Sequence, residues 1–114
     1  MRLRYTAYIL LLALLTSAQC QQTAEEWFNK GDLLLNLGEY IEAIDAYNKA
    51  IELNQSYVVA WSHRGNALLN LTEYQESLKC YNKAIEIDPQ YPNAWNNKGA
   101  ALASVASIIK CRKA

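Results

Sequence analysis

The stretch WSHRGNALLNL, residues 61–71, has the spacing of an amphipathic helix but carries a glycine near its centre. Trp61, Leu68 and Leu71 share one apolar face. A glycine inside a helix costs about 1 kcal/mol relative to alanine. The close approach of a second helix at Gly65 would offset this cost, because it would allow tighter packing.

The motif around this glycine occurs three times. WFNKG begins at Trp27, WSHRG at Trp61 and WNNKG at Trp95, so the two intervals are equal. Residues 24–57 and 58–91 align without a gap and share 16 identities in 34 positions. A fixed period of this length predicts stacked copies of one structural unit.

Each complete unit predicts two helices joined by a short turn. In the first unit they span about residues 24–37 and 40–53, where apolar residues recur at intervals of three and four. Thr23 and Glu26 form a capping-box pattern at the first start. The short connections allow only antiparallel neighbours. Small residues would let the two helices of a pair approach closely at Gly31, Gly65, Gly99, Ala43, Ala50, Ser77 and Ala84.

The sequence resembles the tetratricopeptide repeat family. In the second unit the family signature is carried by Trp61, Gly65, Tyr74, Tyr81, Ala84 and Pro89. The resemblance implies an all-α fold, a right-handed α-solenoid of antiparallel helix pairs. The repeat domain would span residues 21–103, with units 24–57 and 58–91 and a partial unit 92–103. The family pattern is broken at Gln55, where proline is usual, and at Thr72, which replaces the turn glycine.

Residues 104–114 form a divergent tail. No turn glycine or acidic–aromatic pair follows Leu102. Three interpretations stay open: a degraded second helix, a terminal helix that caps the array, or the truncated or frame-shifted end of a longer array. The tail is mostly apolar at Val105, Ala106, Ile108 and Ile109, unlike the polar outer face of a cap. An apolar end favours self-association, and an array this short is expected to be marginally stable.

Residues 1–20 have the order of a secretory signal peptide. Arg2 and Arg4 precede an apolar run over residues 7–15, and small residues follow. The run is too short to span a bilayer comfortably. We expect an exported protein, secreted or extracytoplasmic, with cleavage after Ala18 or, as a second choice, after Cys20. An uncleaved segment would leave the protein associated with a membrane.

The cysteines and asparagines leave further alternatives open. If Cys20 is removed with the signal, Cys80 and Cys111 remain, either as a disulfide or as two unpaired thiols. No Cys/His cluster has metal-ligand spacing, so we predict no metal site and no cofactor. Asn54 and Asn70 begin two N-glycosylation sequons at inter-helix turns.

The charge distribution argues against a nucleic-acid partner. Residues 21–99 contain 11 acidic and 6 basic residues. Such a surface repels a phosphate backbone and mildly favours a basic peptide.

Catalytic chemistry finds little support in the sequence. His63 is the single histidine, and Ser62 precedes it. Adjacent helical residues point about 100° apart, so these two cannot act as base and nucleophile. The sequence contains no phosphate-binding loop. We therefore predict that the chain is not an enzyme and takes no small-molecule substrate.

The resemblance implies a concave groove, lined by the first helices, that takes a peptide or helix of a partner protein. The residues expected there are Asn29, Asp32, Ser62, His63, Asn66, Asn93, Asn96 and Asn97. Some family members bind the terminal carboxylate of a peptide with lysine and arginine side chains. The matching positions here hold Phe28, His63, Asn93 and Asn97. We therefore exclude this carboxylate-binding class.

Two hypotheses of function remain. In the first, an asparagine ladder, with Asn29 and Asn97 as members and His63 as an interruption, would pair side-chain amides with a ligand backbone. In the second, the chain is an assembly piece, or part of a longer array, that self-associates through its C-terminal end.

Overall fold

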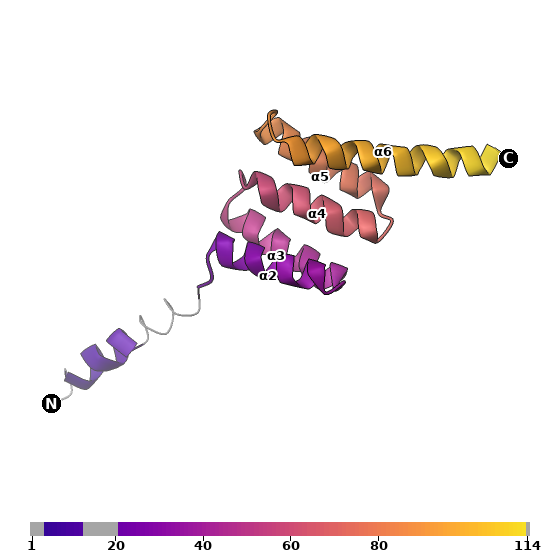
Figure 1. Ribbon diagram of the computed structural model, residues 1–114. Helices are drawn as coiled ribbons and strands as arrows, with labels where there is room; N and C mark the ends of the chain where they lie inside the picture. The colour runs from indigo at the N-terminus through magenta and orange to yellow at the C-terminus, as the bar shows by residue number, and fades with distance from the viewer. Residues whose placement is uncertain (1–3, 13–20, 114) are drawn as a thin grey trace.

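The computed structural model describes residues 4–12 and 21–113, and the repeat region consists of five helices. Their order is α2 (Ala24–Asn36), α3 (Tyr40–Leu53), α4 (Val58–Asn70), α5 (Tyr74–Ile87) and α6 (Pro92–Lys113). They stack as antiparallel neighbours from α2 at one edge to α6 at the other (Figure 1). The described residues contain no strand. The chain is an α-solenoid, as the repeat pattern predicts.

The helix boundaries follow the local signals in the sequence. Thr23 Oγ1 accepts a hydrogen bond of 3.1 Å from the Glu26 backbone N–H, which caps α2. α2 ends one residue earlier than expected, and Gly38 makes the turn with a φ of +80°. Thr72 takes the same place after α4 with a φ of +63°, a strained conformation for a β-branched residue. Pro92 opens α6, where its missing N–H is not needed.

Two of the three repeat glycines lie where the helices of a unit cross. A Cβ atom at Gly31 would stand 2.5 Å from Tyr47 Cε1, and one at Gly65 would stand 2.6 Å from Tyr81 Cε1. Both tyrosines are fully buried. The small residues facing the glycine-bearing helices are buried as well, at Ala43, Ala50, Ser77 and Ala84. The predicted role of Gly31 and Gly65 in close helix approach is confirmed.

Gly99 differs from the other two glycines, and the prediction that a second helix approaches closely there is wrong. No atom lies within 4 Å of a Cβ at Gly99, because no second helix of a third unit follows it within the described residues. Instead α6 continues as one helix to Lys113, across the expected boundary at residue 103. Residues 103–113 contain neither glycine nor proline, so nothing in the sequence stops the helix.

The two cysteines in the described part of the chain are both free. Cys80 is 1% exposed in the core, whereas Cys111 lies on the exposed surface of α6. The alternative of a Cys80–Cys111 disulfide is therefore corrected in favour of two unpaired thiols. Burial raises the pKa of the Cys80 thiol, although the nearby Arg64 guanidinium acts in the opposite direction.

The segment expected to be a signal peptide is only partly described. Residues 4–12 form a helix with exposed side chains. Both candidate cleavage positions, Ala18 and Cys20, lie outside the described residues. Among the described helices, none has both the length and the apolar character needed to cross a membrane.

Candidate functional site

The first helices of the units form one side of the stack. α2 contacts α4 and α4 contacts α6, whereas α3 and α5 do not contact each other. Figure 1 shows the same arrangement, with α2, α4 and α6 in front. The stack is therefore tighter on the side of α2, α4 and α6, which makes this side the concave one. We call it the concave surface.

An aromatic cluster joins the first two units at this surface. The Phe28 ring lies 5.2 Å from the His63 ring and 5.1 Å from the Tyr57 ring, measured between centroids. The His63 ring also meets Tyr47 edge-on at 6.2 Å. Tilted and edge-on pairs at these distances are the favourable geometries for aromatic rings. The cluster therefore fixes how α2 and α4 lie against each other.

A shared carboxylate completes this cluster. Asp32 Oδ1 accepts a hydrogen bond of 2.6 Å from the Tyr47 hydroxyl and one of 2.7 Å from His63 Nδ1. The carboxylate can only accept, so the His63 ring carries its proton on Nδ1 in this contact. In the second unit, Asn66 Oδ1 accepts a 2.6 Å bond from the Tyr81 hydroxyl. Asp32 and Asn66 thus hold the buried ring of their own unit.

The eight residues expected in the groove fall into three groups. Asp32, His63 and Asn66 have a polar side-chain atom engaged in the internal bonds described above. Asn29, Asn93 and Asn96 are exposed, and Asn97 is half-buried. Among the described residues, no hydrogen bond partner is found for the side chains of Asn29, Asn96 and Asn97. These amides are available to a ligand.

Ser62 forms the third group, and the prediction that it lines the groove is wrong. It is 0% exposed, and its Oγ has no hydrogen-bond partner within the described ranges. Ser62 is covered because α4 packs between neighbours on both sides, whereas its counterpart Asn96 in the edge helix α6 stays exposed. A ligand on the surface cannot contact Ser62 in this conformation.

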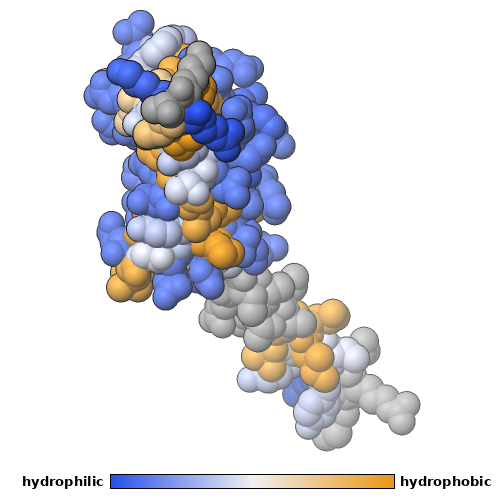
Figure 2. Space-filling model, turned by 90° about the vertical axis from the view of Figure 1, so that its right-hand side faces the viewer, coloured by the Kyte–Doolittle hydropathy of each residue, from blue (hydrophilic) through white to orange (hydrophobic). Residues whose placement is uncertain are grey.

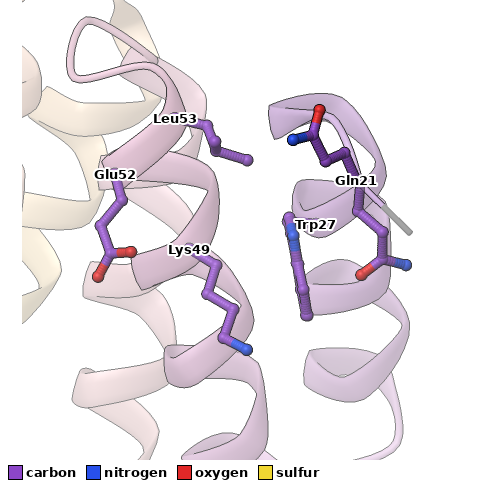
Figure 3. Close-up of a pocket in the computed structure, with 6 residues that line it drawn as sticks. Gln21, Trp27, Lys49, Glu52 and Leu53 are labelled. Carbon is purple, nitrogen blue, oxygen red and sulfur yellow. The ribbon is translucent and has the colours of Figure 1, made fainter. Parts of the chain in front are cut away.

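The open pockets lie elsewhere and recur with the repeat. One pocket of about 400 Å³ is lined by Trp27, Lys49, Leu53 and the two glutamines Gln21 and Gln22, together with Glu52 (Figure 3). A second, of about 410 Å³, has their counterparts one repeat later, at Trp61, Lys83, Ile87, Gln55 and Ser56. This periodicity indicates that both pockets belong to the repeat architecture, and the second one lies where the first unit meets the second. None of the eight expected residues lines either pocket.

The described residues contain no group of three metal-binding side chains. His63 Nδ1 is bonded to Asp32, and the neighbouring Ser62 hydroxyl is buried, so these two side chains do not form a nucleophile–base pair.

The buried tyrosines predict a loss of stability at alkaline pH. Burial raises the pKa of Tyr47, reinforced by the hydrogen bond and the charge of Asp32, and burial also raises the pKa of Tyr81. Above pH ~10 the unfolded chain loses these protons while the folded chain keeps them. The free energy of unfolding should therefore fall as the pH rises above ~10, by up to about 1.4 kcal/mol per pH unit for Tyr47, and Tyr81 should add to this fall.

Urea melts between pH 8 and 11 would measure this slope. Tyr81→Phe should reduce it, and Tyr5→Phe, at an exposed position, should leave it unchanged. Equal slopes in all three proteins would contradict the assignment.

Comparison with known proteins identifies the repeat. A tetratricopeptide repeat model matches residues 24–57, and a TPR repeat model matches residues 73–105. No curated protein matches the sequence.

Several solved structures share the fold. The TPR2B domain of yeast Sti1, in complex with pHsp70, is 29% identical at a TM-score of 0.72, covering 76% of this chain and 70% of that one. The first TPR of Spaghetti (RPAP3), bound to the HSP90 peptide SRMEEVD, is 26% identical at 0.73, covering 81% and 75%. The Sgt2 TPR domain from Aspergillus fumigatus is 24% identical at 0.71, covering 74% of this chain. The chain spans 56% of that domain.

Proposed function

Because the chain carries tetratricopeptide repeats, we propose that it is a non-catalytic module that binds a peptide or helix of another protein on its concave surface. The observation that carries the proposal is the set of unpartnered amides on α2 and α6, at Asn29, Asn96 and Asn97. Asn29 follows Phe28 of the aromatic cluster, in which Asp32 accepts hydrogen bonds from Tyr47 and His63. The similar domains of Sti1 and Spaghetti were solved with peptide or protein ligands, which supports the same class of activity here.

The chemistry of the surface favours an extended segment without an acidic terminus. A side-chain amide offers both a donor and an acceptor, so it can pair with one peptide unit of a ligand backbone. Phe28, His63, Asn93 and Asn97 supply no lysine or arginine for a carboxylate. We therefore expect the acidic peptide SRMEEVD, which the Spaghetti domain binds, not to bind this chain.

A double substitution tests the amides directly. Dodecapeptides would first be selected on the full chain from a random library, and their affinities measured by fluorescence anisotropy. Asn29→Ala with Asn97→Ala should weaken the selected peptides about tenfold, since each lost backbone bond contributes about 0.5–1.5 kcal/mol.

The matched control replaces two asparagines of the second helices. Asn48→Ala with Asn82→Ala changes α3 and α5, which form the opposite side of the stack, and should leave the affinity unchanged. Equal losses in the two double variants, or a selection that yields only SRMEEVD-like acidic ends, would contradict the proposal.

We further propose that the module acts after export. The support is the order of charged, apolar and small residues over positions 1–20. Secreted expression followed by N-terminal sequencing should give a mature chain that begins at Gln19. An intact Met1 on protein retained inside the cell would contradict export.

A further inference from the structure

The turn between α3 and α4 carries a set of residues that its fold does not require. Residues 54–56 read Asn-Gln-Ser and form an N-glycosylation sequon. The turn at the same place one repeat later, between α5 and α6, reads Asp-Pro-Gln over residues 88–90. A sequon needs an asparagine amide, a middle residue other than proline and a hydroxyl at the third position. The two turns differ at all three positions.

The backbone of these two turns is nevertheless the same. Asn54 has a φ of −145° and a ψ of 95°, and Asp88 has a φ of −137° and a ψ of 95°. The side-chain oxygen of each accepts a hydrogen bond from a backbone N–H two residues later, at 3.2 Å from Ser56 and at 3.0 Å from Gln90. In both turns a tryptophan indole N–H donates to the carbonyl oxygen of the middle residue, at 3.0 Å and 2.8 Å. The turn forms with either set of residues, so its fold does not explain the sequon.

The acceptor amide of Asn54 is free in this turn. Residues 54–56 are all exposed. The bond from the Ser56 N–H occupies Asn54 Oδ1, whereas Asn54 Nδ2 and the Ser56 hydroxyl have no hydrogen-bond partner among the described residues. A donor held at Oδ1 stabilises the negative charge that builds there when Nδ2 gives up a proton. The pocket of about 410 Å³ lined by Gln55, Ser56 and Trp61, among others, leaves open space beside the turn.

The second sequon, at residues 70–72, has both of its reacting groups engaged. Asn70 Nδ2 donates a hydrogen bond of 2.9 Å to the backbone oxygen of Asn66. The Thr72 hydroxyl donates one of 2.6 Å to the backbone oxygen of Leu71. Asn70 is still part of α4, Leu71 is half-buried, and Thr72 has a positive φ. Modification at Asn70 would first have to break these bonds.

The two sequons lie at opposite ends of the helices. The α3–α4 turn is on the left in Figure 1, and the α4–α5 turn is on the right. Figure 2 views the end that carries the α4–α5 turn, where hydrophobic side chains form an interrupted band between hydrophilic margins. The exposed polar residues 54–56 suit a hydrated glycan better than a turn beside this band.

We propose that Asn54 of the folded chain is an acceptor site for N-linked glycosylation and that Asn70 is not. The co-substrate is an oligosaccharide linked through a diphosphate to a lipid. Asn54 Nδ2 forms a bond to the anomeric carbon of the first sugar while the bond from that carbon to the diphosphate oxygen breaks. Nδ2 gives up one proton, and the lipid diphosphate leaves with the electron pair. The proposal rests on the proposed export, which would bring the chain to a compartment that holds such a donor.

The test is a glycosylation assay on the purified, folded full chain. The enzyme is a single-subunit oligosaccharyltransferase that modifies peptides of both sequons, with the sequences of residues 50–60 and 66–76, and mass spectrometry measures the occupancy of each site over time. In the folded chain Asn54 should react at least about tenfold faster than Asn70, whose hydrogen bonds must break first. Equal rates at the two sites, a faster reaction at Asn70, or no modification of the folded chain overturns the proposal. The assay needs no export, so its failure and a failure of export are separate results.

The α5–α6 turn supplies matched controls. Asn54→Asp and Gln55→Pro copy Asp88 and Pro89, so both variants should keep the turn and the stability of the parent chain in urea melts. Neither variant retains a sequon, and each should lose all modification at residues 54–56. A glycan that persists there in either variant overturns the assignment to Asn54.

Moving the sequon tests whether the turn itself presents the acceptor. Asp88→Asn with Pro89→Gln and Gln90→Ser places the same three residues in the α5–α6 turn. Because the backbone there matches, residue 88 of this variant should be modified within about threefold of the rate at Asn54. A transferred sequon that stays unmodified would show that the turn does not present the amide, which overturns the geometric basis of the proposal.

Discussion

Gly65→Leu is expected to lower the free energy of unfolding by about 3 kcal/mol or more, because overpacking a tight helix crossing forces backbone shifts. A Cβ alone at this position would stand 2.6 Å from Tyr81 Cε1 and 2.9 Å from its Cδ1. Gly99→Leu places the same side chain in open space and should raise stability by up to about 1 kcal/mol through helix propensity. Urea melts of both variants beside the parent chain measure the difference.

A double-mutant cycle shows whether the Tyr81 ring is the cause. Tyr81→Ala alone should cost about 4 kcal/mol, since it empties a fully buried site. Adding Gly65→Leu to Tyr81→Ala should cost far less than Gly65→Leu does alone, because the ring it would strike is gone. Additive losses, or equal stabilities of Gly65→Leu and Gly99→Leu, would contradict the close approach at Gly65.

The second large effect concerns Asp32. Asp32→Ala removes the shared acceptor and leaves the buried Tyr47 hydroxyl and the His63 Nδ1–H without it. Unsatisfied buried donors cost about 1–3 kcal/mol each, and the partial exposure of Asp32 (34%) and His63 (26%) places the expected loss near 2 kcal/mol.

Asp32→Asn is the matched control, because Asn66 already performs the same task for Tyr81 in the second unit. It keeps an acceptor oxygen and should cost less than about 1 kcal/mol. Thermal and urea melts of the two variants compare them directly. If Asp32→Asn destabilises the chain as much as Asp32→Ala, the carboxylate charge matters more than the acceptor, and this account of the cluster is wrong.

The helices and their crossings could be predicted from the sequence because both leave periodic signals. The constant repeat interval and the spacing of apolar residues predict α3 at its observed bounds, and they identify Gly31 and Gly65 as contact points. The same reasoning failed at Gly99, since a glycine in the motif does not show whether a second helix follows to cover it.

The hydrogen bonds across the site were harder to predict. His63 and Asp32 are 31 residues apart, so their contact depends on how one unit stacks on the next. Ser62 was misplaced for the same reason, because helical spacing alone does not tell which flank a neighbouring unit covers. A signal for the tyrosine acceptors did exist: Asp32 and Tyr47, like Asn66 and Tyr81, are separated by 15 residues.

Chemical-shift mapping of a selected dodecapeptide on the isotope-labelled full chain tests the central proposal most directly. Binding on the concave surface should perturb backbone amides of α2, α4 and α6, including those of Asn29, Asn96 and Asn97, and leave the outer faces of α3 and α5 unchanged. Perturbations confined to α3 and α5, or to the pocket beside Trp27, would contradict the concave surface as the binding site.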